Sequence, residues 1–304
     1  MHKTLFTAAL LATAPLTAPG IAQAQPQALR LCTGAETGNY YQAGRDIAAR
    51  AKGRLDVEVI PTAGSLDNLD RLAAGACDAA VVQSDALYVY ARRKPGSRLA
   101  LEQSADLYEE KLHLVCNREA GLSKVTKLAP TQRVAIGAPG GGTNITWDAF
   151  RLADKKRYEP IPTDPHGGAR ALSRIGTQAA DGTSRATCMA YVTGLRAPSM
   201  QEADEWAKAN PGKIVLTPAD DSDLPGVRDD FGKPLYTRAV IPGGTYPNLQ
   251  PKGFFGGSEE VPTLGVRAAL VTATAFIEAK PDAYDRFLSA VGQAAPSIRQ
   301  RVGQ

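Results

Sequence analysis

The sequence predicts a two-lobed α/β fold, and three observations support this. Strand-like and helix-like segments alternate from Leu29 onward, which is typical of parallel strands joined by crossover helices. A strand, a glycine-rich turn and a helix occur in each half of the chain, at 29–53 and at 133–156. The chain has 304 residues, of which 43% are apolar and 22% charged, so it is long enough to form two lobes.

The first 24 residues have the features of a secretory signal peptide. Lys3 provides positive charge, the apolar run 5–14 is too short to span a bilayer, and Ala22–Ala24 fits a small-residue cleavage site. No lipid-attachment motif precedes Cys32, and no later segment reaches about 18 uninterrupted apolar residues. We therefore expect a soluble periplasmic protein whose mature chain begins near Gln25.

The first half of the mature chain is predicted to form a βαβαβ unit. In its second helix, Leu66, Leu69 and Leu72 share one face, and Ser65 and Gly75 fit the N-cap and the terminator. The predicted segments are a strand at 29–33, a helix at 41–53, a strand at 55–62, a helix at 65–76, a strand at 77–83 and a further helix that ends near 91.

Two β-rich runs are suited to cross between the lobes. Residues 111–122 form the first, and residues 261–272 could return the chain to the first lobe before a covering helix at 282–302. The predicted division is therefore a signal peptide at 1–24, lobe 1 at 25–115 with 262–304, and lobe 2 at 116–261.

The four cysteines have no C-x-x-C spacing, which argues against a zinc or thioredoxin-like site. An oxidising compartment allows one or two disulfides, and four cysteines permit three complete pairings. The pairing of Cys116 with Cys188 is favoured because both lie in the segment assigned to lobe 2; Cys32 and Cys77 are the other two cysteines.

Catalytic and nucleic-acid-binding functions have little support. After the signal peptide only His113 and His166 remain, and His113 lies in an alternating run typical of a structural histidine. The motifs G-x-S-x-G and H-E-x-x-H are absent from the sequence, and the net charge of +4 comes from scattered basic residues. We expect no catalytic residues, no metal and no cofactor.

The two glycine-rich turns precede helices, whose first N–H groups are free to bind an anion such as a carboxylate or a phosphate. Each turn alone could equally be a tight connection. Two such turns in matching places of two lobes favour a ligand site. Neither has the spacing of a dinucleotide fingerprint or the lysine of a P-loop.

Several stretches in register, at 33–44, 61–88, 112–143, 241–248 and 261–272, resemble the TAXI family, the solute-binding receptors of tripartite ATP-independent periplasmic (TRAP) transporters. The resemblance implies a type II periplasmic binding fold with a hinge of crossover strands. It places the following residues in the cleft: Gly34, Thr37, Gly38, Tyr40, Tyr41, Ser65, Asn68, Gln83, Ser84 and Asp85 from lobe 1, and Gly141, Gly142, Thr143 and Asn144 from lobe 2.

The resemblance also implies a function: capture of a small organic acid or amino acid and its delivery to the integral membrane subunits of a TRAP transporter. Because two helix N-termini converge on one cleft, dicarboxylates and acidic amino acids are favoured, and an uncharged or hydrophobic solute is the alternative. We expect a monomer. A sensor that partners a membrane kinase and a periplasmic enzyme are the alternatives. Two charged residues stay open. Glu36 would repel an anion if it pointed inward, and Arg196 could either reach the cleft or lie on the surface.

Overall fold

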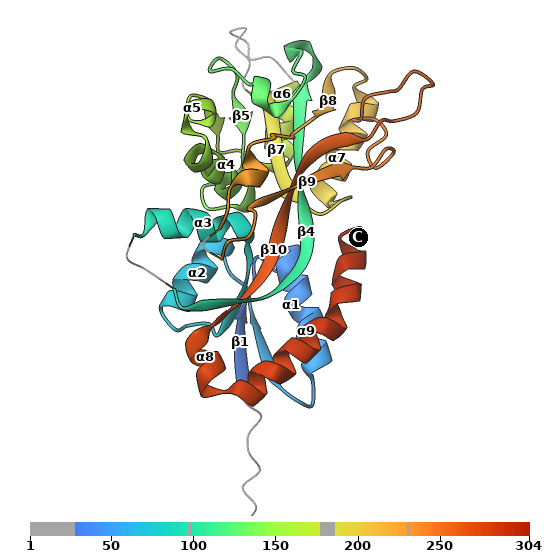
Figure 1. The fold of residues 1–304 in the computed structure, drawn as a ribbon. Helices are drawn as coiled ribbons and strands as arrows, with labels where there is room; N and C mark the ends of the chain where they lie inside the picture. The colour runs from blue at the N-terminus through green and yellow to red at the C-terminus, as the bar shows by residue number, and fades with distance from the viewer. Residues whose placement is uncertain (1–27, 96–98, 177–185, 230) are drawn as a thin grey trace, which may run out of the picture.

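The computed structural model describes residues 28–95, 99–176, 186–229 and 231–304. They form two α/β lobes joined by two long strands (Figure 1). The expected signal peptide lies outside the described residues. One hydrogen-bonded sheet runs through both lobes in the order β2-β1-β3-β10-β4-β7-β5-β6, with β8 added to β4 and β9 added to β10.

Lobe 1 is built on β1, which pairs in parallel with β2 on one side and with β3 on the other, as the alternating pattern predicts. Its elements are β1 (Ala28–Cys32), α1 (Asn39–Ala51), β2 (Asp56–Ile60), α2 (Ser65–Ala73), β3 (Ala79–Gln83), α3 (Ser84–Arg93), α8 (Thr274–Ala279) and α9 (Pro281–Arg301).

Lobe 2 repeats the theme with shorter strands, and β5 pairs in parallel with β6 and β7. Its elements are η1 (Arg118–Ala120), η2 (Val125–Lys127), β5 (Val134–Ala135), α4 (Gly142–Ala153), α5 (Lys155–Tyr158), β6 (Thr163–Asp164), α6 (Gly168–Gly176), β7 (Cys188–Thr193), α7 (Pro198–Ala209), β8 (Ile214–Thr217), η3 (Leu224–Gly226) and β9 (Tyr236–Ile241).

The lobes are joined by β4 (Leu101–Asn117) and β10 (Val261–Ala273), which pair with each other in antiparallel fashion. From Lys111 onward β4 pairs with β7, and near its end also with β8. Along β10 the partner changes from β9 before Arg267 to β3 after it. Figure 1 shows both strands passing through the middle of the molecule. Glu110 and Arg267 therefore lie where the chain changes lobe.

Three apolar clusters form the core. One packs α1 and α9 on the lobe 1 sheet through residues such as Ile47 and Phe287, and another lies within lobe 2 around Met200. The third joins Val82 of lobe 1 to Trp147 of lobe 2, so the lobes are packed together on the side of α3 and α4. Each large buried side chain of this kind contributes roughly 1.5–3 kcal/mol.

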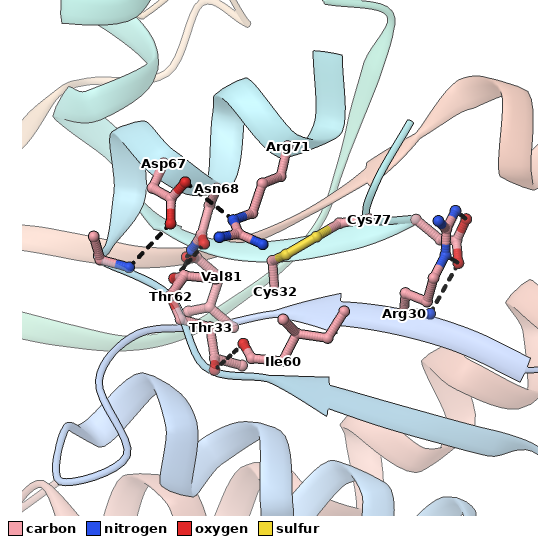
Figure 2. Close-up of a disulfide and its surroundings, with 12 residues drawn as sticks. Arg30, Cys32, Thr33, Ile60, Thr62, Asp67, Asn68, Arg71, Cys77 and Val81 are labelled. Carbon is pink, nitrogen blue, oxygen red and sulfur yellow. Dashed lines mark hydrogen bonds and ion pairs between the residues drawn. A yellow bond between two sulfur atoms is a disulfide. The ribbon is translucent and has the colours of Figure 1, made fainter. Parts of the chain in front are cut away.

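Both disulfides form. The favoured pairing of Cys116 with Cys188 is confirmed, and it joins directly opposite residues of β4 and β7. Cys32 is bonded to Cys77, which ties the end of β1 to the turn before β3 (Figure 2). The sequence separations of 45 and 72 residues mean that each bond closes a long loop, which restricts the unfolded chain.

Candidate ligand-binding site

A cavity of about 550 Å³ lies between the lobes, beside the crossover strand β4. Its volume is in the range of small-molecule sites. Lobe 1 and β4 contribute Gly34, Ala35, Thr37, Gly38, Asn39, Tyr40, Gly64, Ser65, Gln83 and Glu110, and lobe 2 contributes Gly142, Val192, Thr193, Ala197, Pro198 and Ser199. A larger hollow of about 610 Å³ is lined only by lobe 1, around Lys52–Val57 and Arg286, and lacks this convergence of two lobes.

Four helices begin at the cavity wall. The N-cap positions of α1, α2, α4 and α7 are Gly38, Gly64, Gly141 and Ala197, and none of these four caps has a side-chain hydrogen bond. In α7, Pro198 has no N–H and the N–H of Met200 donates to the carbonyl of Ala197 at 2.9 Å, which leaves the N–H of Ser199 at the cavity wall. The positive ends of four helix dipoles thus face one space, which favours a bound anion.

Glu110 is the single charged side chain among the lining residues. It is 7% exposed, and its Oε2 accepts a hydrogen bond of 3.0 Å from the hydroxyl of Tyr40. Burial raises the pKa of Glu110 to about 8, the charge of Asp85 acts in the same direction, and the bond from Tyr40 opposes them. The sequence argument missed this residue, although Glu110 is in phase with the buried Leu112 and Leu114 of the same strand.

Seven of the predicted site residues line the cavity: Gly34, Thr37, Gly38, Tyr40, Ser65, Gln83 and Gly142. Ser65 Oγ accepts a 3.0 Å hydrogen bond from the backbone N–H of Gln83, and Gln83 Nε2 donates to Thr146 Oγ1 of lobe 2 at 3.2 Å. A Cβ at position 142 would collide with the amide oxygen of Gln83. Glycine there allows the two lobes to approach at this point.

Ser84 and Asp85 lie beside the cavity, buried between the lobes. Asp85 Oδ2 accepts hydrogen bonds from Thr146 Oγ1 at 2.6 Å and from the hydroxyl of Tyr236 at 3.1 Å. Ser84 Oγ donates to the carbonyl of Leu235 at 3.2 Å. Burial raises the pKa of Asp85 to about 6, and its hydrogen bonds partly oppose this. We call Ser84, Asp85, Thr146 and Tyr236 the interlobe seam.

Asn68 is fully buried beneath the cavity, where it holds three segments of lobe 1 together (Figure 2). Its Nδ2 donates to the carbonyls of Thr33 at 2.5 Å and Val81 at 2.8 Å, and its Oδ1 accepts from Thr62 Oγ1 at 2.6 Å. These bonds occupy the whole amide group and fix the turns that present α1 and α2 to the cavity.

The remaining lobe 2 candidates support the backbone around the cavity. Thr143 Oγ1 accepts a 3.0 Å bond from the N–H of Val192, and Asn144 Oδ1 accepts a 3.1 Å bond from the N–H of Gly140. Gly141 precedes the lining residue Gly142 as the N-cap of α4. Arg196 is exposed, in the left-handed region with φ 59°, and its N–H donates to the hydroxyl of Tyr246 at 2.9 Å.

Tyr41 is half-buried and Glu36 is exposed, and neither is among the lining residues. The sequence argument also missed the beginning of α7, where Ala197, Pro198 and Ser199 face the cavity directly after Arg196. A proline after a turn often marks the first residue of a helix, so Pro198 carried a signal for this element.

His113 has a structural environment. It is fully buried, its Nε2 lies 3.1 Å from the hydroxyl of Tyr246, and its Nδ1 lies 2.9 Å from the carbonyl oxygen of Lys111. Burial lowers the pKa of His113 to about 4, so the imidazole is neutral near pH 7.

In the part of the chain that the structure describes, no helix is both long and apolar enough to cross a membrane.

The two lobes, the two crossover strands and the sheet around them form the type II periplasmic binding protein fold. The sequence matches the model of the NMT1-like family over residues 31–279, and the chain belongs to this family.

Three solved structures share the fold at low sequence identity. YhfZ from Shigella flexneri is 13% identical with a TM-score of 0.50, and the match covers 92% of each chain. The periplasmic aliphatic sulphonate binding protein SsuA from Escherichia coli is 12% identical with a TM-score of 0.50, over 91% of this chain and 75% of that one. The periplasmic sulfonate-binding protein SsuA from Methylobacillus flagellatus KT is 10% identical with a TM-score of 0.50, over 88% of this chain and 68% of that one.

Proposed function

We propose that the protein is an exported solute receptor that captures a small carboxylate, either an organic acid or an amino acid, in the cavity between its lobes. The observation that carries this proposal is the convergence of four helix N-termini without side-chain caps on one cavity between the lobes. Backbone amides at such positions bind anions without a basic side chain, and the lining residues include no lysine, arginine or histidine.

The lobes, 25–115 with 262–304 and 116–261, would close on the ligand by bending β4 and β10 near Glu110 and Arg267. Ligand then stabilises the closed form because it touches both faces only in that form. The resemblance to TAXI receptors supports delivery to the membrane subunits of a TRAP transporter and a periplasmic location. A sensor for a membrane kinase would use the same closure, and an enzyme would in addition convert the bound compound.

A thermal-shift screen of organic acids, amino acids and alkanesulfonates tests the proposal. Sulfonates belong in the panel because two fold neighbours are named for binding them. A ligand at 100 times its Kd stabilises the folded state by about 2.7 kcal/mol. We expect carboxylates to raise the melting temperature and to reduce the radius of gyration in small-angle scattering. Stabilisation only by uncharged solutes would contradict the proposal, and chemical turnover of the ligand would favour an enzyme.

A further inference from the structure

We infer that Glu110 binds an ammonium group of the ligand, so that the cavity selects an α-amino acid over the acid with the same skeleton and no amine. This inference rests on the proposed function and names the class of its substrate. It depends on the buried position of Glu110 at the cavity, on the absence of a cationic partner for its carboxylate among the described residues, and on the helix N-termini around the cavity.

Glu110 is more than nine-tenths buried and lines the cavity from β4, at the point where the chain changes lobe. Its one side-chain hydrogen bond comes from Tyr40, and among the described residues no lysine, arginine or histidine forms an ion pair with it. A carboxylate held away from water with a single neutral donor is unfavourable in its ionised form unless a cation joins it. The cavity is the place from which such a cation can come.

The rest of the wall suits the other end of an amino acid. The first turns of α1, α2, α4 and α7 offer backbone N–H groups to a carboxylate, while Glu110 offers an acceptor to an ammonium. A dicarboxylate would instead bring a second carboxylate into a cavity whose lining residues include no lysine, arginine or histidine to pair with it. The charge pattern therefore matches a zwitterion better than a dianion.

Binding should also move a proton, because Glu110 is largely protonated at pH 7 before the ligand arrives. An ammonium stabilises its ionised form, so the proton is released, and affinity rises with pH up to about pH 8. An acid without an amine would bind the protonated form and lose affinity above that pH. The other titratable and charged groups around Glu110 do not supply a cation to it. The pKa values of Tyr40 and Tyr108 are raised, and that of Asp85 is raised to about 6. Lys111 is paired with Glu109, and Arg267 is paired with Asp229.

Calorimetric titration of the mature protein with matched compounds tests the inference. The pairs are L-glutamate with glutarate, L-leucine with 4-methylpentanoate, and L-alanine with propionate, each measured at pH 7 in buffers of different ionisation enthalpy. We expect an amino acid to bind roughly 10- to 150-fold more tightly than its partner, as a charge-assisted hydrogen bond implies, and to release up to about one proton.

Glu110→Gln should abolish both the preference and the proton release. Glu102→Gln is the matched control, because Glu102 lies on the same strand and likewise accepts a bond from a tyrosine hydroxyl, that of Tyr284, at 2.6 Å, but lies outside the cavity. Equal binding of the paired compounds by the unmodified protein would overturn the inference and leave the proposed function intact. Binding of neither compound of any pair, together with no response to carboxylates in the thermal-shift screen, would instead count against the proposed function. Retention of the preference in Glu110→Gln would also overturn the inference.

Discussion

Two buried carboxylates, Asp85 and Glu110, lie between the lobes, close enough for the charge of Asp85 to raise the pKa of Glu110, and their surroundings differ. Asp85 is fully buried and accepts hydrogen bonds from Thr146 and Tyr236, both outside lobe 1. Glu110 accepts one bond, from Tyr40 of lobe 1, and otherwise faces the cavity. The same chemical group therefore serves two purposes. Asp85, which is hydrogen-bonded by residues of the opposite lobe, holds the lobes together. Glu110, which faces the cavity, is available to a ligand.

The largest effect that we expect is on the pH dependence of stability. Burial raises the pKa of Asp85 to about 6 and that of Glu110 to about 8. For an acid with a raised pKa, the folded state binds the proton more tightly, so its contribution to stability is full below the unfolded pKa and is lost as pH rises through the folded pKa. The buried His113, whose pKa is lowered to about 4, acts in the opposite direction below about pH 6.5, and the net free energy of unfolding of the unliganded protein should fall by a few kcal/mol between about pH 5 and pH 8.

Denaturant melts across this range measure the effect. Glu110→Gln should remove most of the fall, above all between about pH 6.5 and pH 8, because below that range the loss at Asp85 is offset by the gain at His113. If the free energy of unfolding of the unmodified protein is constant from pH 5 to pH 8, the two carboxylates are less deeply buried than in the structure.

Asp85→Ala should destabilise the protein by about 2–4 kcal/mol, because Thr146 and Tyr236 would keep buried donors without an acceptor. Tyr236→Phe is the matched control. It removes one of the two bonds and the donor with it, so a loss of about 1 kcal/mol is expected. Urea unfolding monitored by circular dichroism gives both values. A cost below about 0.5 kcal/mol for Asp85→Ala would contradict the assignment of a holding role to the seam.

Gln83→Ala should weaken ligand binding by roughly 5- to 150-fold, because Gln83 lines the cavity and reaches Thr146 across it. Thr143→Ala is the comparison, since Thr143 accepts a bond from Val192 and does not line the cavity. It should cost about 1–2 kcal/mol of stability with little change in affinity. Titration and melts of both variants separate the roles, and a specific loss of affinity in Thr143→Ala would place its hydroxyl at the ligand.

The architecture could be predicted from the sequence because local patterns, namely alternating apolar segments and glycine-rich turns, indicate its strands and helices. The alternation of segments from 29 to 91 and the two glycine turns predicted the lobes, the β-rich runs at 111–122 and 261–272 predicted the crossover strands, and the resemblance added the type II fold. The pairing of Cys116 with Cys188 followed from placing both in neighbouring segments.

The division of polar residues between seam and cavity could not be predicted, because it depends on how the lobes meet. Ser84 and Asp85 follow Gln83 directly, yet only Gln83 lines the cavity, since the chain turns into α3 at that point. Glu110 escaped notice because Glu109 and Lys111 flank it in a charged run, although its alternation with Leu112 and Leu114 indicates which of the three side chains faces inward.

The smallest effect is expected at the exposed edge of the seam. Arg93 of α3 forms an ion pair with Asp148 of α4. Because the arginine side chain is 49% exposed, water screens the pair, and Asp148→Asn should cost no more than about 1 kcal/mol. The difference should shrink further in 0.5 M salt. A loss as large as that of Asp85→Ala would mean that surface charge, rather than the buried seam, holds the lobes together.

The distinction between seam and cavity is tested most directly by calorimetric titration of Glu110→Gln and Asp85→Ala with the amino acid that binds best to the unmodified protein. Glu110→Gln should bind roughly 10- to 150-fold more weakly while unfolding at pH 7 at an equal or higher urea concentration, because glutamine lacks the buried ionisable carboxyl. Asp85→Ala should unfold at a lower urea concentration and, below its transition, keep an affinity close to that of the unmodified protein. If Asp85→Ala loses affinity while Glu110→Gln binds normally, the two carboxylates have been assigned the wrong roles.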